Sequence, residues 1–218
     1  MTSSSSSAQN PKFRLAVLLL AAGEGSRLGA HPKALLRKDG ITLLEGLCNA
    51  IQQFEPVECV AVTGFHAKEI ESEMAKINLS LDYPMRPVRN YAPERGQASS
   101  IRLGLEAIQE EFDVLLVALS DQPEVGAKEI QELLDEYTKR EGSEEIILPV
   151  VDGKRGNPVL FSYEAVSNIL AIPGMVCREF MDVNPSKVRT MHTSNQAFVL
   201  DVDTSEDIQK HKLSRTEF

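Results

Sequence analysis

Residues 15–29 read LAVLLLAAGEGSRLG, an apolar run that passes directly into a glycine-rich segment. The run from Leu15 to Ala21 is typical of a strand that is buried on both faces of a parallel sheet. Gly23 and Gly25 then let the backbone approach a ligand and point amide N–H groups at anionic oxygens. A buried strand that ends in such a loop predicts an α/β protein that binds a triphosphate.

Apolar runs of the same kind recur along the chain and alternate with segments of helical periodicity. We expect strands at residues 15–21, 57–63, 114–119 and 146–151, and helices at about 42–54, 67–77, 97–111 and 127–140. Strands and helices that alternate in this way form a mostly parallel central sheet with helices on both faces. The fold class is therefore α/β, a Rossmann-like three-layer sandwich.

The last third of the chain has a less regular pattern. Here we expect a turn at 153–158, a short strand at 159–161, a helix at 162–172 and a last strand at 199–203. Thr204 and Ser205 are well placed to cap a final helix. The serine-rich residues 1–12 are expected to be a disordered tail, and residues 13–218 a single domain.

The composition is typical of a globular protein, with 42% hydrophobic and 25% charged residues among 218. No apolar run is long enough to span a membrane. The formal charge of -9, from 23 basic and 32 acidic residues, argues against nucleic acid as a partner. The three cysteines show no paired spacing. We therefore expect buried thiols, a reducing compartment and a cytoplasmic location.

Two cations follow the glycine-rich loop, Arg27 and Lys33. Arginine suits bidentate phosphate contacts and lysine acts as a compact charge, so together they can stabilise a leaving pyrophosphate. The alternative is a tight turn that carries two solvated charges. A dinucleotide-binding fingerprint fails, because Pro32 interrupts the helix that it requires. A Walker A motif is also absent.

Two acidic residues follow predicted strands. Asp121 comes after the strand at 114–119, at the carboxyl edge where ligands bind in open α/β sheets. Asp203 ends the expected last strand, with Asp201 on the same face. Two carboxylates can hold Mg²⁺ together. Each aspartate could instead cap a turn or a helix.

Several short blocks in this order and spacing resemble one family of enzymes. They are the glycine-rich loop with Pro32-Lys33, RGQASSI at 95–101, SDQP at 120–123, GKRGNPV at 153–159 and DVDTSED at 201–207. Together they are similar to the nucleotidyltransferases that include the molybdenum cofactor cytidylyltransferases and guanylyltransferases. The resemblance implies a glycosyltransferase-A-like nucleotidyltransferase fold and selects Asp121 and Asp203 as the Mg²⁺ ligands.

The resemblance also implies which residues bind the two substrates. Those expected at the nucleotide are Ala21, Ala22, Gly23, Glu24, Gly25, Ser26, Gly96, Gln97, Ser99 and Ser100. Those expected at the acceptor are Arg155, Gly156, Asn157 and Pro158. Ser99 and Ser100 begin a predicted helix, where hydroxyl and free N–H groups can bind a base or ribose, although simple capping also explains them. The G-x-x-S-S-I pattern looks like the cytidylyl-transferring branch and favours CTP over GTP.

These residues predict a Mg²⁺-dependent transfer of CMP from CTP to a phosphorylated small molecule, with Arg27 and Lys33 as catalytic residues. Molybdopterin is the preferred acceptor, and a molybdoenzyme or its chaperone is a candidate protein partner. A sugar- or polyol-phosphate acceptor is the alternative, because the stretch at 174–178, GMVCR, lacks the acidic residue and second glycine usual in cofactor cytidylyltransferases. An inactive nucleotide-binding regulatory module is a further alternative, and a dinucleotide-dependent oxidoreductase is disfavoured by the motifs.

Overall fold

The computed structural model describes residues 13–216, so the tail expected at 1–12 lies outside the described residues. The central sheet has the strand order β10-β7-β9-β6-β1-β4-β5, and β8 pairs with β7 beside this path. Its strands are β1 (Leu15–Ala21), β4 (Glu58–Thr63), β5 (Met85–Arg89), β6 (Val114–Leu119), β7 (Ile146–Val151), β8 (Lys154–Arg155), β9 (Val159–Ser162) and β10 (Val188–His192). A separate hairpin joins β2 (Arg37–Lys38) to β3 (Ile41–Thr42).

Strand β1 lies in the interior of the sheet, between β6 and β4, and every one of its residues is buried. It pairs in parallel with β4 on one side and β6 on the other. Its side chains alternate between two apolar clusters: Val17 and Leu19 belong to one, and Leu18 and Leu20 to the other. This alternation explains why the run shows no polar residue, since both faces of the strand are covered.

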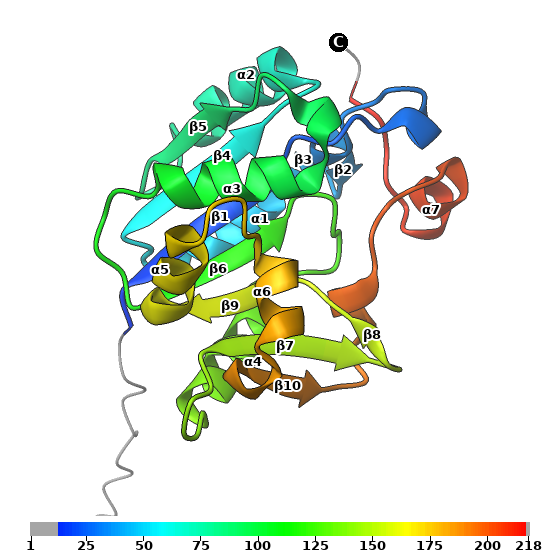
Figure 1. Cartoon of the computed structure of the whole chain (residues 1–218). Helices are drawn as coiled ribbons and strands as arrows, with labels where there is room; N and C mark the ends of the chain where they lie inside the picture. The colour runs from blue at the N-terminus through cyan, green and yellow to red at the C-terminus, as the bar shows by residue number, and fades with distance from the viewer. Residues whose placement is uncertain (1–12, 217–218) are drawn as a thin grey trace, which may run out of the picture.

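Helices cover both faces of the sheet. The covering helices are α1 (Leu43–Gln52), α2 (Ala67–Ile77), α3 (Gln97–Ala107), α4 (Ala127–Thr138), α5 (Tyr163–Ala171) and α6 (Cys177–Val183). Helix α7 (Ser205–Lys210) has no buried residue and lies apart from the sheet (Figure 1). In Figure 1, α3, α5 and α6 lie in front of the sheet, and α1 and α4 lie behind it. The three-layer α/β fold with a mostly parallel sheet is thus confirmed. The sheet is mixed, because β9 is antiparallel to both β6 and β7.

The predicted last strand at 199–203 is wrong. The chain forms a short 3-10 helix there (Gln196–Val199), and residues 200–203 pair with no strand of the described chain. Val202 is fully buried in a third apolar cluster with Leu28, Leu36, Leu43 and Leu213, so its apolar character reflects packing against loops. The last strand of the sheet is β10, which lies at an edge and carries polar residues.

Other local features also differ from expectation. The turn at 153–158 contains the short strand β8, which folds back on β7. Helix α3 ends at Ala107 rather than at residue 111. The final helix begins with a capping box of Thr204 and Asp207, in which the Thr204 hydroxyl accepts the N–H of Asp207, while Ser205 is already helical. Within residues 13–216, none of the helices combines the length and apolar character needed to cross a bilayer.

Candidate functional site

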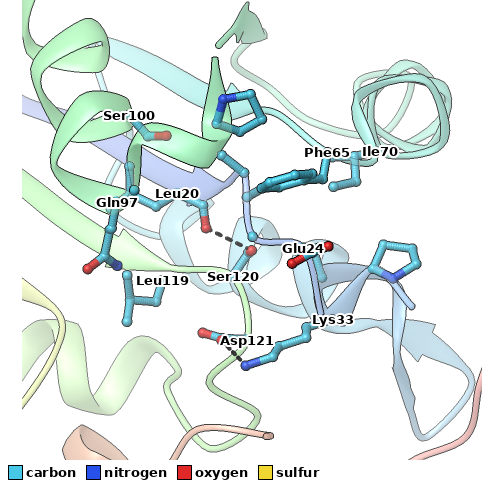
Figure 2. Close-up of a pocket in the computed structure, with 17 residues that line it drawn as sticks. Leu20, Glu24, Lys33, Phe65, Ile70, Gln97, Ser100, Leu119, Ser120 and Asp121 are labelled. Carbon is cyan, nitrogen blue, oxygen red and sulfur yellow. Dashed lines mark hydrogen bonds and ion pairs between the residues drawn. The ribbon is translucent and has the colours of Figure 1, made fainter. Parts of the chain in front are cut away.

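A cavity of about 290 Å³ opens at the carboxyl ends of β1 and β6. The residues after β1 form one wall, and the start of α3 forms another (Figure 2). Nine of the residues singled out from the sequence line it: Ala21, Ala22, Gly23, Glu24, Lys33, Gly96, Gln97, Ser100 and Asp121. Gly25, Ser26, Ser99, Arg27 and Asp203 are not among its lining residues.

Four charged side chains form a chain of contacts at this cavity. Lys33 Nζ lies 3.2 Å from Asp121 Oδ2 and 2.5 Å from Asp203 Oδ1. Arg27 Nη1 lies 2.7 Å from the other oxygen of Asp203. The two cations and the two carboxylates expected from the sequence therefore lie together, although Asp203 is separated from Lys33 by 170 residues.

Asp203 reaches the site without a strand to position it. The N–H of Val202 donates to the carbonyl of Asp121 at 3.3 Å, and the Val202 side chain is buried. On the other side, the N–H of Asp203 donates to Asp207 Oδ2 at 3.0 Å, and Asp207 also caps α7. An apolar anchor and a helix cap thus fix Asp203 from both sides.

The charges alter the protonation equilibria of the site. Burial lowers the pKa of Lys33, but its contacts with Asp203 and Asp121 outweigh burial and raise the pKa overall. Burial raises the pKa of Asp121, and Lys33 opposes this effect. Lys33 is therefore held as a cation at neutral pH, where it can bind an anionic ligand.

The loop after β1 depends on Gly25. This residue has a φ of +66°, in the left-handed region, and a Cβ on it would lie 2.1 Å from the carbonyl oxygen of His31. Its carbonyl also accepts N–H groups from Leu28 and Ala30. The loop can keep this conformation only with glycine at position 25.

Asn90 is a residue of the site that no sequence motif identifies. Its side chain is buried and its Nδ2 donates to Ser99 Oγ at 2.9 Å and to Ser100 Oγ at 3.0 Å. Its Oδ1 accepts the N–H of Ala92, which fixes the orientation of the amide. Ser99 also donates to the carbonyl of Gly96. Ser100 therefore accepts from Asn90 and lines the cavity, where its hydroxyl hydrogen can face a ligand acceptor.

Phe65 is a second residue that the sequence does not identify, because it follows β4 in a segment without a recognisable motif. It lines the cavity and is 44% exposed. Figure 2 shows its ring at the wall opposite Gln97. An exposed aromatic ring in this lining offers a flat surface on which a base can stack.

A second cavity of about 490 Å³ adjoins the first, and Leu20, Gln97 and Leu119 line both. Three of the four residues expected at the acceptor, Arg155, Gly156 and Asn157, line it, whereas Pro158 does not. The Gly156 N–H donates to Pro149 and the Asn157 N–H donates to Phe198, both at 2.8 Å. These bonds hold the expected acceptor loop against the sheet.

The donor set at the first cavity suits a hard divalent cation. Asp121 and Asp203 contact the same ammonium group, so their oxygens converge on one point. Among residues 13–216 there is no cluster of three or more histidine, cysteine, aspartate or glutamate side chains that could hold a metal. Mg²⁺ typically binds one or two carboxylates and takes its other ligands from water and substrate phosphates. Two aspartates therefore fit Mg²⁺ with a bound nucleotide.

The fold is that of the nucleotidyltransferase class, a glycosyltransferase-A-like α/β fold. A model of the MobA-like NTP transferase domain matches residues 17–185. The chain therefore belongs to the family of MobA-like NTP transferase domains.

Two relatives match part of the chain. Nicotine blue oxidoreductase of Paenarthrobacter nicotinovorans is 38% identical over 117 residues, which is 54% of each protein. The bifunctional protein GlmU of Rubrobacter xylanophilus is 28% identical over 124 residues, 56% of this chain and 25% of that protein. The chain thus spans from a quarter to about half the length of these curated relatives.

Solved structures support the fold over most of the chain. Rv0371c of Mycobacterium tuberculosis H37Rv has a TM-score of 0.70 and 23% identity, with 90% of this chain and 97% of that chain covered. A structure of the same protein in complex with manganese has a TM-score of 0.66 and 20% identity, with 91% and 97% covered. At these identities the likeness establishes the fold.

Proposed function

We propose that this protein transfers a nucleoside monophosphate from a nucleoside triphosphate, CTP in preference to others, to a phosphorylated small molecule and releases pyrophosphate. The observation that carries the proposal is the convergence of Lys33, Arg27, Asp121 and Asp203 beside the glycine-rich loop. Two cations and two acids in mutual contact, of which Lys33 and Asp121 line the cavity, match the needs of a triphosphate with a divalent ion. Family membership is consistent with the same reaction.

In the proposed reaction, an oxygen of the acceptor phosphate attacks the α-phosphorus in line. The bond between the α-phosphorus and the bridging oxygen breaks, and pyrophosphate leaves with the electron pair. A phosphate monoester is already anionic at neutral pH, so the chain needs no general base for this step. Lys33, Arg27 and the backbone N–H groups of the glycine-rich loop stabilise the charge that develops on pyrophosphate.

Asp121 and Asp203 are proposed to hold Mg²⁺, which when bound neutralises charge between the phosphates. The structure of Rv0371c with manganese supports a divalent ion in this fold. Gln97 and Ser100 are proposed to contact the base or ribose, and Arg155, Gly156 and Asn157 the acceptor. The preferred acceptor is molybdopterin, with a molybdoenzyme or its chaperone as recipient of the product. Sugar and polyol phosphates remain the alternative.

The test is a matrix of four nucleoside triphosphates against molybdopterin, sugar phosphates and polyol phosphates, in Mg²⁺, with pyrophosphate as the readout. We expect a signal with CTP and molybdopterin that EDTA abolishes. A signal with a sugar or polyol phosphate alone would reassign the acceptor and keep the reaction. Nucleotide binding without pyrophosphate release from any pair would instead support a regulatory module.

One control addresses the relative that is named as an oxidoreductase. The same protein is incubated with reduced nicotinamide cofactors, and their absorbance is followed with nicotine blue as electron acceptor. We expect no oxidation, because the loop after β1 lacks the glycine spacing of a dinucleotide fingerprint. Oxidation of the cofactor without pyrophosphate release in the matrix would contradict the proposed function.

A further inference from the structure

The second cavity has an apolar floor. Strands β6, β7 and β9 supply Val117, Leu148 and Phe161, and all three side chains are buried. Helix α6 supplies Cys177 and Met181 as a side wall. These residues belong to one continuous apolar cluster on this face of the sheet. A ligand that fills the cavity therefore contacts apolar side chains.

The charged residues that line this cavity are all cations. Lys154, Arg155 and Arg178 line the cavity, and no aspartate or glutamate is among its lining residues. Arg155 pairs with Asp182 of α6 at 2.7 Å, and both side chains are about half exposed. The whole chain carries a formal charge of -9, whereas the lining of this cavity contains three cations and no acidic residue. This lining favours an anionic ligand.

Uncharged polar groups are scarce in the same place. Gln97 and Asn157 supply the only uncharged polar side chains among the lining residues. A hydroxyl group buried against Val117 or Leu148 would lose its hydrogen bonds to water without a replacement, which weakens binding. An aromatic or aliphatic group in that position would strengthen binding, because removing apolar surface from water is favourable in free energy. The cavity therefore discriminates against a ligand with many hydroxyl groups.

We infer that the second cavity binds the body of the acceptor, and that the acceptor is a phosphate monoester with an aromatic or hydrocarbon body rather than a sugar or polyol phosphate. This inference rests on the proposed function. The two cavities adjoin at Leu20, Gln97 and Leu119, and Asp121 lies in the first. An acceptor can thus place its phosphate at the junction, near the α-phosphate of the nucleotide, while its body covers the apolar floor.

The test measures binding without nucleotide or metal, using 1-naphthyl phosphate as the probe. The chain has no tryptophan, so the naphthyl fluorescence can be followed directly. Glucose 1-phosphate, glycerol 3-phosphate and inorganic phosphate are titrated as competitors. We expect 1-naphthyl phosphate to bind at least about tenfold more tightly than each competitor. Equal affinities, or tighter binding of a sugar phosphate, would overturn the inference.

Two methionines on the same face provide a matched pair of variants. Met181 lines the cavity, whereas Met175 packs against the same apolar cluster without lining it. We expect Met181→Gln to weaken 1-naphthyl phosphate binding several-fold and Met175→Gln to leave it unchanged, with thermal unfolding of both as a folding control. Loss of affinity in both variants alike, or in neither, would place the probe elsewhere and overturn the inference.

A CTP titration of the same proteins separates this inference from the function on which it rests. Met181→Gln is expected to bind CTP like the wild type. If CTP binds and pyrophosphate is released while 1-naphthyl phosphate does not bind, the inference is wrong and the proposed function stands. If 1-naphthyl phosphate binds as expected but no nucleotide does, the proposed transfer reaction is wrong, while the ligand class of the cavity is supported.

Discussion

Lys33 contacts both aspartates of the site and also lines the first cavity. Its ammonium group joins Asp121 to Asp203, and the same group lines the first cavity, where a triphosphate is proposed to bind. Its pKa is raised by those carboxylates, so it stays charged across the neutral pH range. A single side chain therefore neutralises the acids in the free protein and is available to the phosphates in the complex.

Replacement of this side chain should reduce turnover far more than it reduces folding stability. We expect Lys33→Ala to lower kcat by about 100-fold or more, the loss typical when a group that stabilises transition-state charge is removed. Lys128→Ala is the matched control, because Lys128 lies on α4 with 78% of its side chain exposed. Pyrophosphate release measures both variants. Wild-type turnover in Lys33→Ala would remove lysine from the proposed mechanism.

Gly25 sets the shape of the loop that precedes Lys33. We expect Gly25→Ala to cost about 1–2 kcal/mol in backbone strain, because its φ is positive and a Cβ would meet the His31 carbonyl. The affinity for CTP should fall as the loop shifts. Gly126→Ala serves as the control, since a Cβ there would lie 3.7 Å from its nearest neighbour, Glu129. Unchanged CTP affinity in Gly25→Ala would show that the loop does not depend on this glycine.

The side chain of Glu58 connects three segments of the fold through hydrogen bonds. Its carboxylate accepts from Arg86 of β5 and from the N–H groups of Gln109 and Glu110, just after α3. Burial raises the pKa of Glu58, but these hydrogen bonds outweigh burial and lower the pKa overall. A carboxylate whose pKa is lower in the folded state stabilises the fold above its unfolded pKa, and this contribution is lost as the pH falls.

We therefore expect Glu58→Gln to destabilise the protein by about 1–3 kcal/mol at pH 7, because a charged acceptor of three hydrogen bonds is lost. The difference between wild type and variant should shrink as the pH falls through the lowered pKa of Glu58. Urea unfolding at several pH values between 3 and 7 measures this difference. An ordinary glutamate has a pKa of about 4.3, so the difference should begin to shrink near that pH. A difference that stays constant with pH would contradict the assigned ionisation.

Some elements could be predicted from sequence and others could not, for identifiable reasons. The strands β1, β4, β6 and β7 are buried, so their apolar runs identify them. Strands β5 and β10 lie at the two edges of the sheet, where polar residues and Pro87 are tolerated, and both were missed. The segment at 199–203 misled the prediction, since Val202 packs into a small cluster between loops.

Some residues of the site could likewise be predicted from the sequence, and others could not. The charged residues could be found because glycine and charge patterns mark them in the sequence, and the structure brings Arg27, Lys33, Asp121 and Asp203 together. Their catalytic and metal-binding roles stay predictions. Asn90 and Phe65 could not be found, because their importance depends on contacts made in three dimensions, with Ser100 in one case and with the cavity in the other.

The site depends on a small apolar cluster that is separate from the two larger ones. Val202, Leu28 and Leu213 are buried together and join the loop after β1 to the end of the described chain. Val202 also bonds to Asp121 through its N–H. The position of Asp203 thus follows from the packing of the residue that precedes it.

Two valine variants test this dependence. Val202→Ala and Val166→Ala each remove two methyl groups from a buried position, so each should cost about 1–3 kcal/mol of stability. Val166 lies on α5 in a different apolar cluster. Pyrophosphate release should fall in Val202→Ala by more than it falls in Val166→Ala, measured well below the unfolding temperature of both. Equal losses of turnover would mean that Asp203 does not rely on Val202.

The four charged residues also predict that metal and nucleotide bind cooperatively. In the free protein Lys33 and Arg27 already neutralise Asp203, and Lys33 neutralises Asp121, so a divalent ion must compete with these cations. A triphosphate draws the cations towards its own oxygens and leaves the carboxylates to the metal. Because coupling between two sites is reciprocal, the metal must tighten nucleotide binding by the same factor.

Electron paramagnetic resonance of Mn²⁺ measures this coupling directly. We expect weak Mn²⁺ binding to the free protein and binding at least about tenfold tighter with CTP, a coupling of about 1.4 kcal/mol, after correction for the Mn²⁺–CTP complex in solution. Lys33→Ala should bind Mn²⁺ more tightly than the wild type without nucleotide, because two neighbouring carboxylates are left without their shared cation. Lys128→Ala should behave like the wild type. Weaker nucleotide-free Mn²⁺ binding in Lys33→Ala would contradict competition between lysine and metal for the same two acids.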